Sequence, residues 1–418
     1  MVASLDQQQP LSILWLGRRV PLPLDSGDRV YSFRLIEATA RTGAQVTSCA
    51  LLPPSVAAGK LPEAIDWNPV EVEELGALRG LLSSLPLVSA RSSPPRMVAA
   101  LRALLRRKRF DAVVFDYYAP AWALEELRHA GHKGRIAYVA HNYEGRLARD
   151  IARDFRGNPL RQVLLNWNAG KIARLEKKLV EAADLVVCLT ERDRDDFQAE
   201  IRRDVPYLIL PPGYSGLRVA SRQIAPSVPR RAVMLGSVRW IAKQMNVEAF
   251  LAAADEKFHR AGISIDIIGD TPDEFRNKWQ SCLKAARFRG FVADVAHELA
   301  MARIGLMIEA TGGGFKLKLQ DYIYHRVPVA ALSGSFEGLP PAVTDTFLVE
   351  PDMERLADRI IAEIDRVEDL DLRQNQAFEG ARGLFDWDEN ARALVAALRG
   401  GQAAPQAAAP SGMQESAA

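Results

Sequence analysis

The chain has 418 residues, of which 48% are hydrophobic and 25% are charged, as in ordinary soluble globular proteins. Its length predicts two domains that each bury a sizeable core. The formal net charge of +2 argues against wholesale binding of nucleic acid, so we expect no nucleic-acid partner.

The cysteines and the apolar runs indicate in which cellular compartment the protein resides. Cys49, Cys188 and Cys282 lie far apart and form no C-x-x-C pair, which predicts neither a zinc site nor a disulfide framework. Residues 1–10 are polar, unlike a signal peptide, and no apolar run approaches the roughly 18 residues that span a bilayer. We therefore expect a cytoplasmic protein that is soluble or peripheral at the inner face of a membrane.

A loop rich in proline and glycine follows the first predicted strand. An apolar run over residues 11–16 predicts that buried strand, and a helix is expected from about residue 29 to 41. The loop between them contains Gly27 and Asp28. In open α/β sheets ligands bind at the carboxyl ends of the strands, so these two residues are candidates for a ligand site.

A polar cluster follows a later strand in the same way. The strand is expected over residues 135–140, and His141, Asn142 and Glu144 come directly after it. A lone histidine is ordinarily a hydrogen-bonded structural residue, but the position of His141 at the ligand edge of the sheet favours a role in the site.

The helix expected over residues 96–108 is strongly basic at one end. Arg102 and Arg109 belong to a stretch without any acidic residue between positions 91 and 110. This pattern fits a solvated helix end stabilised by the macrodipole, and it also fits a contact with anionic lipid headgroups.

Asp193 and Asp195 form a D-x-D sequence, a pattern that can bind a metal ion. Both residues fall in the first turn of an expected helix, where acidic residues are common because they interact favourably with the helix dipole. We therefore predict no metal site.

The second half of the chain restarts the alternation of strands and helices after a polar linker near residue 213. A strand is expected over residues 232–235, and Arg239 and Lys243 follow it before a helix expected from residue 246.

A glycine turn between a strand and a helix is the clearest candidate site. Gly312, Gly313 and Gly314 precede a helix that carries Lys318 and, one turn later, Asp321. Backbone N–H groups without Cβ atoms at a helix N-terminus can receive a phosphate, although such a triplet can also be an ordinary loop. A neighbouring lysine and carboxylate suit a nucleoside diphosphate. The turn is neither a Walker loop nor G-x-G-x-x-G.

This segment, with Val327-Pro328-Val329 after the helix, resembles the donor-binding segment of family 4, or group 1, glycosyltransferases with the GT-B fold. The resemblance extends over about residues 11–398. It implies that Lys318 binds the donor diphosphate and Asp321 the ribose. Gly313 stands where many members have an acidic residue, and Arg326 stands where a small residue is usual.

The resemblance also implies roles for the residues after the other strands. Lys243 and Arg239 would hold the donor diphosphate, and His141 would lie near the reacting sugar. The loop with Gly27 and Asp28 would face donor and acceptor, and Asn142 and Glu144 are similar to a family sequence at this edge.

The implied fold is α/β, with two Rossmann-like domains whose parallel sheets face each other across a cleft. We expect an acceptor domain over residues 11–213, a nucleotide-sugar domain over 214–385 and a helix over 386–399 that crosses back to the first domain. Residues 1–10 and 400–418 have the composition of disordered ends.

The implied function is a retaining, metal-independent glycosyltransferase that moves a sugar from a nucleoside diphosphate to a glycan, lipid-linked or small-molecule acceptor in polysaccharide synthesis. His141 and Lys243 are the expected catalytic residues, and no cofactor besides the nucleotide sugar is expected. A nucleotide-sugar 2-epimerase of the same architecture and a weakly active nucleotide-binding relative remain alternatives.

Overall fold

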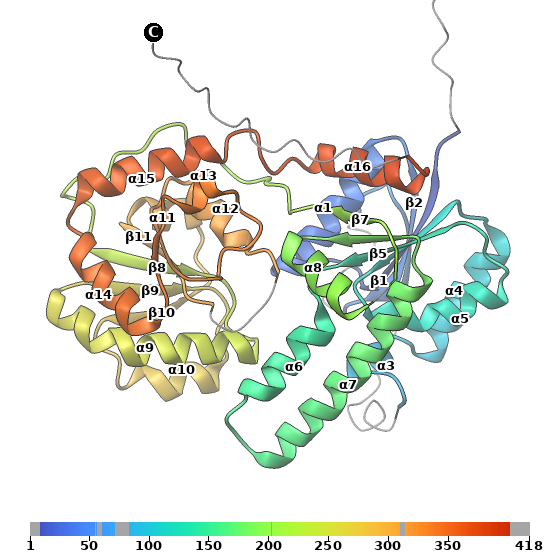
Figure 1. Cartoon of the computed structure of the whole chain (residues 1–418), viewed down its shortest axis with the longest axis horizontal. Helices are drawn as coiled ribbons and strands as arrows, with labels where there is room; N and C mark the ends of the chain where they lie inside the picture. Colours follow the sequence, from blue (N-terminus) through green and yellow to red (C-terminus); the bar gives the residue numbers. More distant parts are fainter. Residues whose placement is uncertain are drawn as a thin grey trace, which may run out of the picture.

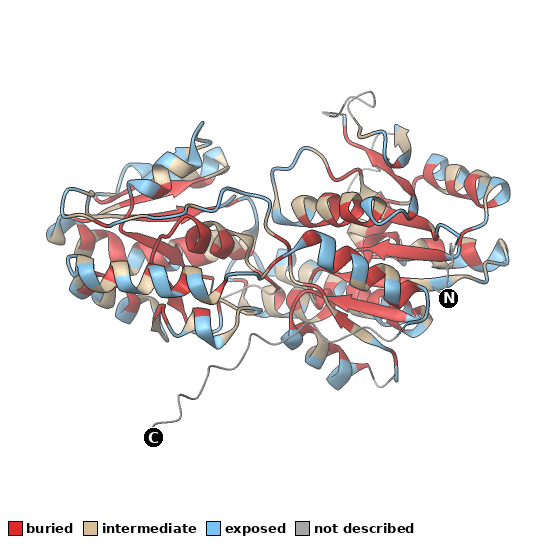
Figure 2. Cartoon of the chain, turned by 90° about the horizontal axis from the view of Figure 1, so that it is seen from above, coloured by how far each residue is buried: buried red, intermediate tan, exposed pale blue. Residues whose placement is uncertain are grey.

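The computed structural model describes residues 9–54, 56, 61–71, 83–201, 203–309 and 314–401. They form two domains, each a parallel sheet with helices on both faces, joined by a linker (Figure 1). The predicted fold class, two Rossmann-like domains, is confirmed. The inner strands are buried between the helices, because runs such as AVVFD and LVVC are apolar enough to lie between two covered faces (Figure 2).

The first domain has a seven-stranded sheet in the order β3-β2-β1-β4-β5-β6-β7, with every pair parallel. Its strands are β1 Ser12–Arg19, β2 Gln45–Leu52, β3 Asp66–Glu71, β4 Ala112–Asp116, β5 Arg135–Ala140, β6 Leu185–Cys188 and β7 Tyr207–Ile209. Its helices are α1 Gly27–Arg41, α3 Leu87–Arg91, α4 Pro95–Arg107, the 3₁₀ helix η2 Ala119–Ala123, α5 Leu124–His129, α6 Glu144–Asp154, α7 Pro159–Ala182 and α8 Glu191–Glu200.

The second domain has a six-stranded sheet in the order β10-β9-β8-β11-β12-β13, again entirely parallel. Its strands are β8 Arg231–Leu235, β9 Ser264–Ile268, β10 Ala286–Gly290, β11 Ile304–Met307, β12 Val329–Leu332 and β13 Leu348–Glu350. Its helices are α9 Ile241–Ala261, α10 Asp273–Gln280, α11 Val295–Ala300, α12 Leu317–Tyr324, α13 Pro341–Thr344, α14 Met353–Glu363 and α15 Val367–Gly380.

The last helix, α16 Trp387–Leu398, lies on the first domain against α1 (Figure 1). Arg41 of α1 pairs with Asp388 at 2.7 Å, and the rings of Tyr31 and Trp387 meet edge-on at 5.5 Å. Asn390 of α16 donates a hydrogen bond to the carbonyl of Pro211 at 2.6 Å. From the second domain, Gln320 of α12 donates one to the carbonyl of Pro212 at 2.6 Å, so the linker is held from both sides.

Several expected boundaries differ from the structure. Strand β1 continues through Arg19, because it stays paired with β2 to that residue. Helix α1 begins at Gly27, so Gly27 and Asp28 lie in its first turn and not in a loop. Helix α9 begins at Ile241, which places Lys243 in its first turn. Strand β3 has no counterpart in the sequence analysis, because its residues are only half-buried and show no clear alternation. The ends expected to be disordered lie mostly outside the described residues.

Candidate active site

The carboxyl edges of the two sheets face each other, and residues from the segments that follow the strands of the two sheets come into contact there. A Cβ placed on Gly314 would lie 2.2 Å from Oδ1 of Asn142, and one on Gly27 would lie 3.1 Å from the Leu317 side chain. Gly314 has a φ of +71°, a conformation that glycine adopts without strain. Polar residues from both domains are therefore brought to one place.

His141 is held by a buried carboxylate from the neighbouring strand. Its Nε2 lies 2.7 Å from Oδ1 of Asp116, the last residue of β4, and the other oxygen of Asp116 accepts a hydrogen bond from Trp15 Nε1 at 2.9 Å. Burial lowers the pKa of His141, but the hydrogen bond and charge of Asp116 outweigh it, so the pKa is raised above its ordinary value. The pair fixes the orientation of the imidazole.

Glu144 lies beside this pair in the first turn of α6. Its carboxylate accepts hydrogen bonds from Asn142 Nδ2 at 2.7 Å and from the Tyr117 hydroxyl at 3.1 Å. Burial raises the pKa of Glu144 to about 7, and these hydrogen bonds limit the rise. The cluster can therefore gain or lose a proton near neutral pH.

A second buried carboxylate, Glu176 of α7, holds the start of α6. It accepts hydrogen bonds from the backbone N–H groups of Glu144 at 3.2 Å and Gly145 at 2.7 Å, and from the Tyr138 hydroxyl at 2.7 Å. Burial raises the pKa of Glu176 to about 8. Glu176 therefore positions Glu144 through the backbone.

Across the interface, three lysines gather around one carboxylate of the second domain. Glu309, two residues after β11, pairs with Lys318 at 2.8 Å and with Lys316 at 3.2 Å. Lys243 of α9 is close enough for its charge to act on Glu309. Burial raises the pKa of Glu309, but the three cations outweigh it and hold the pKa well below its usual range. The cluster has more positive than negative charge, which suits an anionic ligand.

Lys243, like the other two lysines of this cluster, is half-buried. Burial lowers its pKa, and Glu309 opposes that effect. It lines a small hollow with Gly236, Ser237 and Lys318 at the end of β8. Asp28 of α1 also acts on its charge, so this lysine lies where the two domains meet.

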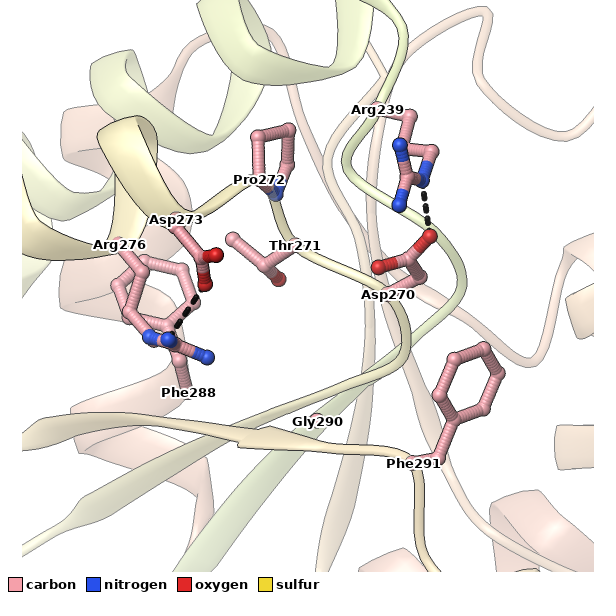
Figure 3. Close-up of a pocket in the computed structure, with 9 residues that line it drawn as sticks. All are labelled: Arg239, Asp270, Thr271, Pro272, Asp273, Arg276, Phe288, Gly290 and Phe291. Carbon is pink, nitrogen blue, oxygen red and sulfur yellow. Dashed lines mark hydrogen bonds and ion pairs between the residues drawn. The ribbon is translucent and has the colours of Figure 1, made fainter.

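Arg239 does not join the lysine cluster. It pairs with Asp270 at the rim of a pocket of about 400 Å³, beyond the carboxyl ends of β8, β9 and β10 (Figure 3). The Phe291 ring stands at the other side of Asp270 in Figure 3 and is 75% exposed, so its face is open to a flat ligand group.

Asp321 lies on α12, one turn after Lys318, beside Tyr214 of the linker. Burial raises the pKa of Asp321 to about 6, and a hydrogen bond from Tyr214 opposes the rise. Gly312 and Gly313 lie outside the described residues, so of the predicted glycine turn only Gly314 can be placed.

Of the D-x-D sequence, only Asp193 lies in the first turn of α8, where both aspartates were expected. Asp193 is buried and accepts hydrogen bonds from Thr190 Oγ1 at 2.6 Å and from the Tyr143 N–H at 3.1 Å. Within the described ranges, no group of three or more His, Cys, Asp or Glu could hold a metal ion.

Sequence reasoning missed Asp116, Glu176 and Glu309 as parts of this site. Asp116 and Glu309 each lie at the end of an apolar strand, the same signal that singled out His141, and could have been found by it. Glu176 lies within a long helix, far from any strand end, so the strand-end signal does not mark it.

Comparison with known proteins identifies the class to which this fold and site belong. Residues 26–213 match the glycosyl transferase 4-like domain, and residues 229–365 match the glycosyl transferases group 1. Together these matches cover most of the chain. The chain therefore belongs to the group 1 glycosyltransferases and is a glycosyltransferase of the GT-B architecture. A search of curated proteins found no match.

Solved structures share the fold at low sequence identity. A sucrose-phosphate synthase from Thermosynechococcus elongatus is 15% identical with a TM-score of 0.70, covering 93% of this chain and 98% of that one. WaaG, a glycosyltransferase involved in lipopolysaccharide biosynthesis, is 16% identical with a TM-score of 0.63, covering 93% and 100%. HepE from Anabaena, in complex with UDP and glucose, is 15% identical with a TM-score of 0.62, covering 93% and 100%. Within the described ranges, no helix is long and apolar enough to cross a membrane.

Proposed function

We propose that this protein transfers a glycosyl group, with retention of configuration and without a metal ion, from a nucleoside diphosphate sugar to a hydroxyl of a glycan or lipid-linked acceptor. The proposed role is in cell-surface polysaccharide synthesis, in the cytoplasm. The observation that carries the proposal is the grouping of Lys243, Lys316 and Lys318 around the buried Glu309, opposite the His141–Asp116 pair.

The lysine cluster is the proposed seat of the donor diphosphate. When the bond between the sugar C1 and the phosphate oxygen breaks, negative charge grows on the leaving diphosphate. Glu309 holds Lys318 in place before the reaction, so this lysine can stabilise that charge with little reorganisation, and Lys243 lies close enough to add its own charge. Each such donor can contribute about 3 kcal/mol to the transition state. Because side-chain cations supply this charge, the proposal needs no divalent ion.

In the proposed step, the acceptor oxygen bonds to C1 on the face that the diphosphate leaves. The acceptor proton passes to the leaving phosphate oxygen, so no side chain acts as general base. Asp116 engages Nε2 of His141, which leaves Nδ1 as the ring nitrogen available to position the sugar. The contact between Gly314 and Asn142 closes the site against water at that point.

We assign one candidate position to the ribose of the donor and another to its base. Asp321 is the proposed ligand of the ribose hydroxyls, one helical turn beyond Lys318. The pocket in Figure 3 suits the base, because Phe291 offers an exposed ring for stacking and Asp270 and Arg239 offer polar groups. HepE was solved with UDP and glucose, so UDP is the first nucleotide to test.

A thermal-shift panel of UDP, GDP and ADP, with Mg²⁺ or with EDTA, tests the donor site. The expected result is a rise in Tm with one nucleotide that is equal under both conditions and is lost in Lys318→Ala. Lys278→Ala is the matched control, because Lys278 is an exposed lysine that pairs with Glu248 in the same domain. A shift that requires Mg²⁺ would refute metal independence, and a shift retained in Lys318→Ala would refute the site.

Transfer itself is tested with the sugar conjugate of the nucleotide that binds. NMR of the product reports the anomeric configuration, and retention is expected. An inverted product would overturn the proposed step while leaving donor binding intact. Phe291→Ala is expected to weaken nucleotide binding by roughly 10-fold or more, through the loss of one stacking contact.

A further inference from the structure

Helix α7 carries an apolar stripe that no part of the described chain covers. Leu160, Val163, Leu164 and Trp167 are 76%, 65%, 45% and 45% exposed, and their spacing of three, four and seven residues puts them on one face. Most other exposed large apolar residues lie singly on other elements. A contiguous exposed stripe of this kind marks an interaction surface.

The charged residues in the sequence around the stripe are all basic. Between positions 155 and 175 the sequence has Arg156, Arg161, Lys171 and Arg174 and no acidic residue. The ammonium of Lys171 lies 3.3 Å from the centroid of the Trp167 ring. Leucine, valine and tryptophan beside several cations are the composition of helices that lie in the interface of an anionic bilayer.

The stripe is coupled to the active site through the α6–α7 hairpin, which projects from the first domain (Figure 1). Helix α6 starts at Glu144 in the site, and Glu176 of α7 bonds to the backbone there. From Leu160 to Glu176 the helix rises about 24 Å, at roughly 1.5 Å per residue. A surface bound at the stripe is therefore held at a set distance from the site.

We propose that the stripe docks on an anionic phospholipid bilayer and presents the site to an acceptor whose sugar is linked to a membrane lipid. The acceptor class rests on the proposed function; the docking does not. A second copy of the chain fits the stripe less well, because the exposed cations Arg156, Arg161 and Arg174 would then face the same three charges. An anionic headgroup layer neutralises them instead.

Vesicle flotation tests the docking with the full chain. Vesicles of phosphatidylcholine with one quarter phosphatidylglycerol are compared with pure phosphatidylcholine at low and high salt. The intact protein is expected to float with the anionic vesicles, and Leu160→Ser/Val163→Ser is expected to reduce binding at least 10-fold. Leu217→Ser/Leu372→Ser is the matched control, since these leucines are 60% and 57% exposed elsewhere, and it should bind as the intact protein does.

Three results would overturn the proposal. One is the absence of flotation with anionic vesicles, or flotation that the stripe variant retains. Another is loss of binding only in Arg106→Glu/Arg107→Glu, which would assign the contact to the basic end of α4. The third is self-association in sedimentation velocity that the stripe variant abolishes, without any vesicle binding, which would assign the stripe to a second copy.

A measurement of nucleotide binding distinguishes a failure of the docking proposal from a failure of the proposed function. The stripe variant should keep the full nucleotide-induced rise in Tm and hydrolysis of the donor in solution, and lose transfer to an acceptor embedded in vesicles. If the intact protein floats but no nucleotide shifts its Tm, the proposed function fails and the docking stands. If nucleotides bind but no vesicle does, the docking fails alone.

Discussion

The ammonium of Lys318 lies 2.8 Å from Oε1 of Glu309, and the two side chains are only 14% and 7% exposed. Glu309 holds Lys316 with its other oxygen, so a single carboxylate keeps like charges together. The Glu309 carboxylate occupies the position to which the same lysines would attract an oxygen of a diphosphate. Without a ligand, this carboxylate is the anion that keeps the lysines positioned.

Glu309→Gln is therefore expected to destabilise the empty protein. Removing the charge leaves three lysines that repel each other in a partly dehydrated place, and breaking a buried ion pair costs on the order of 3 kcal/mol. Urea unfolding measures that loss. Bound nucleotide restores negative charge, so the rise in Tm with nucleotide should exceed that of the intact protein. An unchanged unfolding free energy would contradict the role given to Glu309.

Asp116→Asn is expected to change the tautomer of His141. If the Asn carbonyl keeps the hydrogen bond from Trp15, its amide faces Nε2, which must then accept and cannot carry a proton. Hydrogen bonds to charged groups are worth about 1.5–3 kcal/mol, so kcat is expected to fall roughly 10- to 100-fold.

The pKa of His141 should also fall in Asp116→Asn, because the hydrogen bond and charge of Asp116 raise it. NMR titration of the imidazole measures that shift. Trp15→Phe is the control, since it removes the other partner of Asp116 and leaves the bond to His141 in place. A His141 pKa that is the same in Asp116→Asn and the intact protein would refute the pairing.

The buried carboxylates Glu144 and Glu176 make stability fall as pH rises. Their pKa values in the folded state, about 7 and about 8, lie above the ordinary value of 4.5. The folded protein therefore binds protons more tightly than the unfolded chain. Their contribution is fully present below about pH 4.5 and is lost as pH rises through 7 to 8.

Glu176→Gln should flatten this pH dependence, because an amide does not titrate. The unfolding free energy measured in urea between pH 6 and pH 9 gives the slope for both proteins. Glu181→Gln, an exposed glutamate of the same helix, is the control and should leave the slope unchanged. Equal slopes for Glu176→Gln and the intact protein would mean that Glu176 does not hold its proton in this range.

Gly314→Ala is expected to push the domains apart. The new Cβ would overlap Asn142 and the backbone of His141, and a φ of +71° costs alanine about 1–2 kcal/mol. Gly334→Ala is the matched control, because Gly334 has a φ of +78° with nothing within 4 Å. Small-angle scattering should show a larger radius of gyration, and transfer should fall, only for Gly314→Ala. If both variants behaved alike, backbone strain alone would explain the effect of Gly314→Ala, and the predicted clash with Asn142 would be refuted.

Much of the site could be predicted because its signals are local. An apolar run that ends in polar residues defines both a strand and its ligand edge, which singled out His141, and the glycine turn before a helix singled out Lys318. Helix starts were less predictable, since α1 and α9 begin earlier than their apolar periodicity indicates. The predicted ribose ligand, Asp321, faces Tyr214 of the linker, a neighbour that no local pattern reveals.

The amino-acid sequence by itself determined the alternation of strands and helices, the two-domain fold and the cations at the second sheet edge. These follow from the period of apolar residues and from the chemistry of turns, which act within a few residues. Only the tertiary structure decided that Asp116 holds His141 and that Gly314 meets Asn142. Such pairings join elements up to 172 positions apart in the printed sequence, and they depend on how both sheets and the linker pack together.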